Sequence, residues 1–233
     1  IAVVAIGGTI SVSTADANGI YVLGTQAVTV TNVAPTGSLT GAGDTNEGAT
    51  YLLSISASDA AGIADPLSYS IDWGDGSAAQ VLTAAALAAL GGQVGHVFAD
   101  DQDGPVNATP RNVVVTVTDG DGGSTDLAKT VTVHNVAPSA TVSGAATTDE
   151  GSVYTLTVGA VSDPGADTRT GYTIDWGDGS VTTLTPAQWA AAAGSFTHTF
   201  ADGASGGTIS VSTADEDGSY VLGTQAVTVT NVA

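Results

Sequence analysis

Acidic residues are the side chains of this sequence that could do chemistry. The chain of 233 residues carries 23 Asp and Glu against 3 Lys and Arg, a formal net charge of −20. Carboxylate and amide oxygens are the hard ligands that Ca²⁺ takes in flexible number. The candidate metal ligands are Asn32, Glu47, Asp59, Asp65, Asn135, Asp163 and Asp167. Their types predict Ca²⁺ as the cofactor, provided that the fold brings them together.

The composition argues against several other kinds of chemistry. A chain without Cys forms no disulfides and no zinc–thiolate sites. Three scattered cations cannot form the basic stripe that nucleic acids require, so we expect no nucleic-acid partner. No apolar run is long enough for membrane insertion. Ser, His and Asp are present without a Gly-x-Ser-x-Gly elbow or a similar context, so the sequence predicts no enzyme.

Internal repeats organise the chain. The segment Asn32–Pro35 returns as Asn135–Pro138, and Asp72–Ser77 returns as Asp175–Ser180, both at a shift of 103 residues. Residues 7–34 also match residues 206–233 at a shift of 199, with 25 of 28 positions identical. The sequence therefore predicts two repeats, residues 35–137 and 138–233, preceded by residues 1–34 as the C-terminal strands of another repeat. We hypothesise that the chain is a window of a longer array.

Alternating apolar residues predict β-strands within each repeat. Tyr51, Leu53 and Ile55 form one such face, and Val113, Val115 and Val117 form another. The Ala-rich runs at 84–90 and 186–193 predict one short helix in each repeat. About seven strands in roughly 100 residues, with a Trp on a central strand, indicate an all-β fold of tandem immunoglobulin-like antiparallel β-sandwiches.

This topology carries acidic loops to the junctions between repeats. The junction between the two full repeats is expected to gather Glu47, Asp75, Asn135, Asp163, Asp167, Asp215 and Asp217. The junction with the preceding repeat is expected to gather Asn32, Asp59, Asp65, Asp119 and Asp121. Two interpretations stay open: these groups bind Ca²⁺, or each Asp caps the backbone of its own turn and binds nothing. For Asp75 and Asp178, in the Trp-Gly-Asp-Gly-Ser turns, the capping interpretation is favoured.

Five motifs follow one another in order along the chain: Asn-Val-Ala-Pro, Glu-Gly, Trp-Gly-Asp-Gly-Ser, His-x-Phe and Val-Thr-Val-Thr-Asp-Gly-Asp-Gly-Gly. This order of motifs resembles that of the polycystic kidney disease (PKD) domain. Bacterial PKD domains occur as tandem arrays in secreted and surface proteins, and some bind calcium near their N-terminal linker. The resemblance implies a non-catalytic spacer or adhesion module with an extracellular or cell-surface location in bacteria.

We therefore expect a structural or adhesive repeat segment of a large surface protein or filament, with linkers rigidified by calcium. Its expected partners are neighbouring repeats of the same array and other copies of the chain in a filament. The alternative is an accessory module that docks a secreted hydrolase on polysaccharide or protein. That alternative predicts exposed coplanar aromatic side chains, whereas Trp73 and Trp176 fall at positions that predict a core.

Overall fold

The structure is a computed structural model that describes residues 5–101, 107–201 and 205–232. The chain divides into two compact units. Unit 1 comprises residues 1–43, 51–96 and 111–131, and unit 2 comprises residues 44–50, 97–110 and 132–233. Each unit is described by itself, and the repeat boundaries at 34/35 and 137/138 stay predictions. No helix in the described part of the chain is long and apolar enough to cross a membrane.

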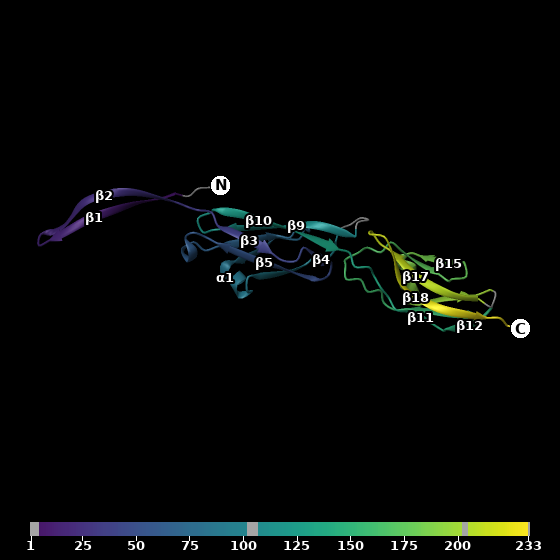
Figure 1. Ribbon diagram of the computed structural model, residues 1–233. Helices are drawn as coiled ribbons and strands as arrows, with labels where there is room; N and C mark the ends of the chain where they lie inside the picture. Colours follow the sequence, from purple (N-terminus) through teal and green to yellow (C-terminus); the bar gives the residue numbers. More distant parts are fainter. Residues whose placement is uncertain (1–4, 102–106, 202–204, 233) are drawn as a thin grey trace. The chain divides into compact units, whose positions relative to one another are not determined.

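Unit 1 begins with a two-stranded antiparallel hairpin (Figure 1). Its strands are β1 (Ala5–Asp16) and β2 (Gly19–Thr31). The turn is closed by the Asn18 N–H, which donates to Asp16 Oδ1 at 2.7 Å. The pairing shifts register between Val12 and Ser13, where the strand has a β-bulge.

Strands β3 to β10 form sheets in the orders β3-β5-β8 and β4-β10-β9-β6-β7. Their bounds are β3 Thr36–Thr40, β4 Asp44–Asn46, β5 Thr50–Ser58, β6 Ser68–Asp72, β7 Gln80–Thr83, β8 Gln93–Val97, β9 Ala108–Thr118 and β10 Ser124–His134. The apolar side chains that alternate in the sequence form the core of unit 1, where they are buried. They include Tyr51, Leu53, Ile55, Tyr69, Ile71, Trp73, Val113, Val115 and Val117.

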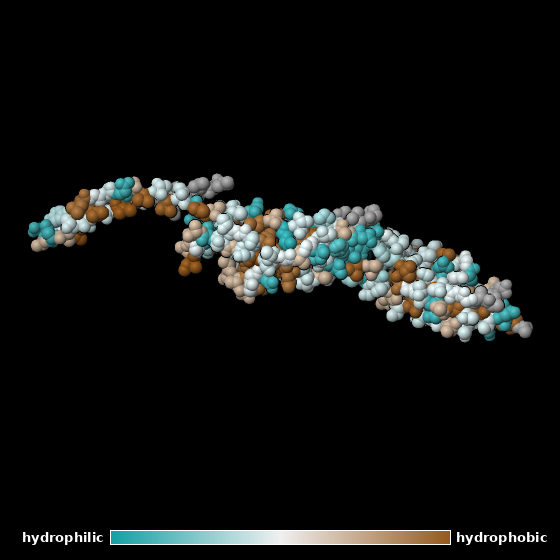
Figure 2. All heavy atoms as spheres, in the orientation of Figure 1, coloured by the Kyte–Doolittle hydropathy of each residue, from teal (hydrophilic) through white to brown (hydrophobic). Residues whose placement is uncertain are grey.

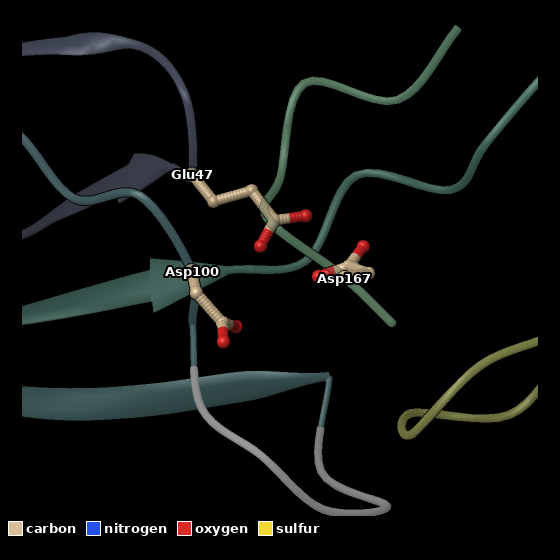
Figure 3. Close-up of side chains that lie close together, drawn as sticks. All are labelled: Glu47, Asp100 and Asp167. Atoms are coloured by element: carbon tan, nitrogen blue, oxygen red, sulfur yellow. The ribbon is translucent and has the colours of Figure 1, made fainter. Parts of the chain in front are cut away.

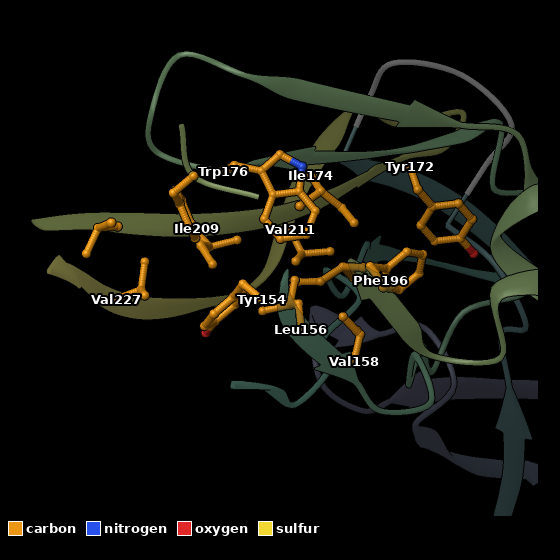
Figure 4. Close-up of a cluster of buried hydrophobic side chains, with 13 residues drawn as sticks. Tyr154, Leu156, Val158, Tyr172, Ile174, Trp176, Phe196, Ile209, Val211 and Val227 are labelled. Carbon is orange, nitrogen blue, oxygen red and sulfur yellow. The ribbon is translucent and has the colours of Figure 1, made fainter. Parts of the chain in front are cut away.

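Strands β11 to β18 form a second pair of sheets in unit 2, in the orders β11-β13-β16 and β12-β18-β17-β14-β15. Their bounds are β11 Val142–Gly144, β12 Thr147–Asp149, β13 Val153–Val158, β14 Gly171–Asp175, β15 Val181–Leu184, β16 Ser195–Thr199, β17 Ser205–Ala214 and β18 Ser219–Thr230. Side chains from both sheets meet in one apolar core, with Ile174 of β14 and Leu156 of β13 from different sheets (Figure 4). This packing of two sheets defines a β-sandwich.

Short helices interrupt the strands where the sequence predicts them. Helix α1 spans Ala84–Ala89 after the N-cap Thr83, and α2 spans Pro186–Ala192 after the N-cap Thr185. Thr185 and Gln188 form a capping box with Pro186 at the first helical position, so the local sequence alone starts this helix. A further 3₁₀ turn, η1, spans Gly62–Ala64. The predicted all-β sandwich fold with inserted helices is confirmed.

Candidate metal centre

Three loops of unit 1 bring three carboxylates together. Asp59 follows β5, Asp65 follows η1, and Asp119 lies in the turn between β9 and β10. One carboxylate oxygen of each residue lies within 4.8 Å of those of the other two. The sequence predicted Asp59 and Asp65 as ligands and placed Asp119 at the same junction. We call these three residues the unit 1 cluster.

Hydrogen bonds hold the Asp119 carboxylate of the unit 1 cluster in its ionised form. Asn32 Nδ2 donates to Asp119 Oδ2 at 2.8 Å. The backbone N–H groups of Gly123 and Asp121 donate to Asp119 Oδ1 at 2.7 and 3.1 Å. Burial alone would raise the pKa of Asp119, but these hydrogen bonds outweigh burial and hold the pKa below its ordinary value.

Within the described ranges of the chain, one buried oxygen of the unit 1 cluster has no hydrogen-bond partner. Asp59 Oδ1 accepts from the Ala61 N–H at 2.7 Å, and the Asp65 carboxylate accepts from the Gly120 N–H. Among the described residues, no group hydrogen-bonds to the buried Asp59 Oδ2. Asp59 and Asp65 also line a cleft of about 380 Å³. The cluster therefore has room beside it and an oxygen that could bind a cation.

Unit 2 contains a larger group of carboxylates, centred on Glu47, Asp100 and Asp167. Glu47 follows β4, Asp100 follows β8, and Asp167 lies between β13 and β14, and their side chains point toward one another (Figure 3). One oxygen of each lies within 4.8 Å of the others. Glu47 is 1% exposed and accepts from the Val136 N–H at 2.6 Å and the Asp101 N–H at 3.1 Å.

Burial is the main cause of a raised pKa at Glu47. The N–H groups of Val136 and Asp101 lower this pKa, while the carboxylates of Asp101 and Asp100 raise it further. The net shift is upward. Glu47 is therefore held by backbone donors in a place where its charge is costly.

The loop of Asp163 to Arg169 approaches Glu47 so closely that two glycines are required. A Cβ on Gly165 would lie 2.6 Å from Glu47 Cδ, and a Cβ on Gly48 would lie 2.3 Å from the Pro164 carbonyl oxygen. Both distances are shorter than real Cβ contacts allow. The Ala166 N–H also donates to the Ala99 carbonyl at 2.8 Å. Backbone packing thus fixes where this loop presents its carboxylates.

A second trio of carboxylates in unit 2 shares Asp167 with the first. Asp163, Asp167 and Asp215 each offer an oxygen within 4.8 Å of the others. Asp163 Oδ2 accepts from Arg169 Nη2 at 3.1 Å, and the Asp163 side chain is 3% exposed. Asp215 Oδ1 accepts from the N–H groups of its own turn, including Gly218 at 3.0 Å. We call the two trios together the unit 2 cluster.

Asn135 and Asp217 form the border of the unit 2 cluster. Asn135 Nδ2 donates to Asp217 Oδ2 and to the Tyr220 hydroxyl, both at 2.9 Å. Asn107 Nδ2 donates to the same hydroxyl at 2.9 Å. With its amide nitrogen engaged in this way, Asn135 is oriented with its Oδ1 buried.

Several buried oxygens of the unit 2 cluster have no hydrogen-bond partner. Among the residues that the structure describes, these atoms are Asn135 Oδ1, Asp163 Oδ1, Asp167 Oδ1 and Oδ2, Asp215 Oδ2 and Asp217 Oδ1. A buried polar atom without a partner is costly, and each such atom in a native protein requires an explanation. A bound cation would explain the oxygens of Asp163, Asp167 and Asp215, because these three residues each offer an oxygen within 4.8 Å of the others.

The raised pKa values of two carboxylates in and beside the unit 2 cluster also favour a bound cation. Burial, followed by the charges of Glu47 and Asp163, raises the pKa of Asp167 to about 7. Burial, followed by the charges of Asp101 and Asp215, raises the pKa of Asp217 to about 6. Burial and neighbouring like charges thus make ionisation of both carboxylates unfavourable when no cation is bound. The cluster is thus short of positive charge even with Arg169 beside Asp163.

The donor set of both clusters fits a hard cation. Every ligand atom considered is a carboxylate or amide oxygen, which suits Ca²⁺, whereas zinc and copper sites draw on imidazole and thiolate ligands. The unit 2 cluster fits better, since Asp163, Asp215 and Asp217 are more than nine-tenths buried and each leaves an oxygen with no partner. If no cation binds, Arg169 and protons on the carboxylates would neutralise the negative charge of the unit 2 cluster instead.

The structure brings the predicted ligands into two groups and adds residues that the sequence argument missed. Asn32, Asp59 and Asp65 lie in unit 1, and Glu47, Asn135, Asp163 and Asp167 lie in unit 2. The residues that the prediction missed are Asp100, Asp101, Asn107, Arg169 and Tyr220. The pair Asp100-Asp101 follows His-x-Phe after one residue, Ala99, and these two adjacent acidic residues were the available signal.

The Trp-Gly-Asp-Gly-Ser turns lie outside both clusters. Asp75 Oδ1 accepts from the Ser77 N–H at 3.0 Å, which is the expected turn-capping bond. Asp75 Oδ2 contacts His96 Nε2 at 2.6 Å, and the His96 ring stacks on Trp73 with ring centroids 4.4 Å apart. Asp178 Oδ2 and His198 Nε2 repeat this contact at 2.7 Å. These groups therefore lock the turn to the core.

No family model matches the sequence, and no curated protein matches it. Among solved structures, the chain is similar to the FN1–FN3 domains of chicken CNTN1, with 13% identity, a TM-score of 0.28, and coverage of 95% of this chain and 75% of that one. It is similar to red sea bream transglutaminase, with 10% identity, a TM-score of 0.33, and coverage of 84% and 31%. It is also similar to the tandem Ig repeats of Dlar, with 11% identity, a TM-score of 0.25, and coverage of 86% and 100%.

The class of the protein follows from its own sheets and cores. Residues of strands β3 to β10 and β11 to β18 repeat one arrangement, a three-stranded sheet and a five-stranded sheet with a short helix. The chain is an all-β protein of tandem immunoglobulin-like sandwiches.

Proposed function

We propose that this chain is a non-catalytic structural or adhesive segment of a large extracellular bacterial surface protein or filament. The repeats are of the PKD kind, and Ca²⁺ stiffens the chain where the acidic loops meet. The observation that carries the proposal is the unit 2 cluster. Glu47 and Asp100 come from the predicted repeat 35–137, and Asp163 and Asp167 come from the predicted repeat 138–233. A cation bound by all four would tie the two sequence repeats together.

Electrostatics and composition support this proposal. A net charge of −20 and a buried group of carboxylates are disfavoured without a counter-charge, and Ca²⁺ supplies it. Extracellular fluid contains enough Ca²⁺ for weak sites, whose Kd values reach about 10⁻⁴–10⁻³ M. A chain without Cys or a catalytic motif has a mechanical role as its simplest function.

The docking-module alternative has less support from the aromatic side chains. Trp73 and Trp176 are 1% and 2% exposed, so neither can stack on a sugar. Trp189 stacks on Tyr172 with centroids 4.1 Å apart and packs against Phe196. These three Trp residues therefore serve the sandwich cores and the helix that covers one of them.

A calcium titration followed by thermal unfolding tests the proposal. The chain is freed of metal with EDTA, dialysed, and melted at rising Ca²⁺ concentrations, with Mg²⁺ as the matched control. A cation at 100 times its Kd stabilises the folded state by about 2.7 kcal/mol, which raises the midpoint by about 10–20 °C for a sandwich of about 100 residues. An unchanged midpoint in millimolar Ca²⁺ contradicts the cation sites. Exposed aromatic binding is tested separately by pull-down on insoluble polysaccharides, where we expect no retention.

A further inference from the structure

In the described part of the chain, the hairpin β1–β2 presents an apolar face that is exposed. Ile10, Val12 and Leu23 are 58%, 57% and 67% exposed, and Val28 and Val30 are exposed with them. Hydrophobic residues follow the hairpin in the space-filling view (Figure 2). An isolated two-stranded hairpin is marginally stable in water, and a contiguous exposed apolar patch marks an interaction surface.

A second copy of the same hairpin shows what covers this face. Strands β17–β18 repeat residues 7–34 at 25 of 28 positions, with the β-bulge at the equivalent place, between Val211 and Ser212. In this copy Ile209, Val211 and Leu222 are 0%, 0% and 4% exposed. The equivalent residues of the first hairpin are the exposed Ile10, Val12 and Leu23. The outward-facing Val22 and Val221 are exposed in both copies, so the difference concerns one face alone.

The cover over β17–β18 is the rest of its own sandwich. Strand β14 pairs with β17, and β12 pairs with β18. Leu156 of β13, Ile174 of β14 and Phe196 of β16 share one core with Ile209 and Val211. These covering strands all lie within residues 138–205.

Two glycines show that the first hairpin retains the shape for such a cover. A Cβ on Gly223 would lie 2.8 Å from Val142 Cγ2, and a Cβ on Gly207 would lie 3.2 Å from the Gly177 carbonyl oxygen. The equivalent Gly24 and Gly8 meet nothing within 4 Å in the described structure. Glycine weakens a strand unless a close neighbour requires it. Its retention at both positions fits a face made for close packing.

The three differences between the copies lie in the turn or in the first two residues of the strand that follows it, away from the apolar positions compared above. They are Ala17 for Glu216, Asn18 for Asp217, and Ile20 for Ser219. We infer that hairpin β1–β2 docks on a half-sandwich with the sequence chemistry of residues 138–205, supplied by a further repeat, and completes its core. The inference rests on the repeat organisation in the proposed function but not on the cation sites.

Hydrogen exchange of an extended chain tests the inference. A copy of residues 138–205 is placed directly before Gly7, so that it continues into the hairpin as Ser205 continues into Gly206. Exchange is measured by mass spectrometry in EDTA, which keeps the outcome independent of any cation. Peptides that span residues 17–20 differ in mass from those that span 216–219, so the two hairpins are distinguished. We expect amide exchange in the first hairpin to slow at least about 100-fold and to approach that of β17–β18.

A matched pair of variants in the extended chain identifies the face that docks. Leu23→Asp places a charge on the apolar face, and Val22→Asp places the same charge on the opposite face of the same strand. We expect Leu23→Asp to abolish the slow exchange and Val22→Asp to retain it. The inference is overturned if the extension leaves exchange unchanged, or if Leu23→Asp remains protected. It is equally overturned if the first hairpin of the original chain already exchanges as slowly as β17–β18.

Discussion

Replacing Asp167 by Asn should make the protein more stable than the parent in the absence of calcium and less stable than the parent in its presence. Asp167 has a pKa of about 7 in the folded protein, against an ordinary value of 3.8. The folded state therefore retains a proton that the unfolded state releases as pH rises from about 4 to about 7. Stability falls across that window, and the full cost is present above it.

The magnitude follows from the size of that pKa difference. A tenfold change in a proton equilibrium is about 1.4 kcal/mol, so the difference corresponds to about 4 kcal/mol. Asp167 is only partly buried, and solvent screening reduces this to about 2 kcal/mol. In EDTA at pH 8, Asp167→Asn should raise the unfolding free energy by about 2 kcal/mol, and at pH 4 the variant and the parent should be nearly equal.

Calcium should invert the comparison, because the variant lacks one charged ligand. In millimolar Ca²⁺ at pH 8 the parent should gain stability and Asp167→Asn should gain much less. Urea denaturation in the four combinations of pH and metal measures this. Asp178→Asn is the matched control, since hydrogen bonds from His198 and Ser180 outweigh burial and hold the pKa of Asp178 below its ordinary value. The reasoning is refuted if Asp167→Asn destabilises the protein in EDTA at pH 8 and leaves its calcium response intact.

Two further substitutions test the contacts around the clusters. Gly165→Ala should lower the unfolding free energy in urea denaturation by about 1–3 kcal/mol, because its Cβ would collide with Glu47. The control is Gly43→Ala, whose Cβ would meet nothing within 4 Å and which should change the unfolding free energy by less than about 1 kcal/mol. Equal effects of the two substitutions would contradict the contact. Asp75→Ala should cost about 1–2 kcal/mol at pH 7, since hydrogen bonds from Ser77 and His96 outweigh burial and lower the pKa of Asp75. The stabilisation by ionised Asp75 is present above the unfolded pKa of about 4 and is lost as pH falls through the lower folded pKa. The destabilisation caused by Asp75→Ala should therefore be smaller at pH 3. An equal destabilisation at both pH values would contradict this account.

Local patterns in the sequence were sufficient to predict the fold. The alternation of Tyr51, Leu53 and Ile55 predicts a strand with one buried face, and all three side chains are buried. Thr185 and Pro186 predict the start of α2, and the capping box confirms it. A strand with one buried face and a capped helix start are each determined by a few neighbouring residues. They can therefore be predicted without knowing how distant parts of the chain fold.

The candidate metal centre was only partly predictable, because its geometry depends on loops. The expected strand order placed Glu47 of the first repeat, and Asp163 and Asp167 of the second, at the junction between the two repeats. It could not show that Arg169 pairs with Asp163, since that contact depends on the path of a loop that has no regular structure. Asp100 was missed for the same reason. The alternation within β1–β2 does not show that its apolar face is exposed, because it is the same as that of the buried copy; the repeat comparison, which assigns residues 1–34 to another repeat, was the available signal.

The pairing of β12 with β18 determines how the sandwich responds to pulling. These strands run parallel, with Thr147 opposite Thr228 and Asp149 opposite Thr230, and one stands near the start of the predicted repeat while the other ends it. Tension applied between the two ends draws parallel neighbours in opposite directions along their length. The hydrogen bonds across the pair are then loaded in shear and must break together, whereas an antiparallel pair pulled from one edge opens one bond at a time. Strands β4 and β10 are also paired in parallel, so the arrangement resists force wherever it recurs along the chain.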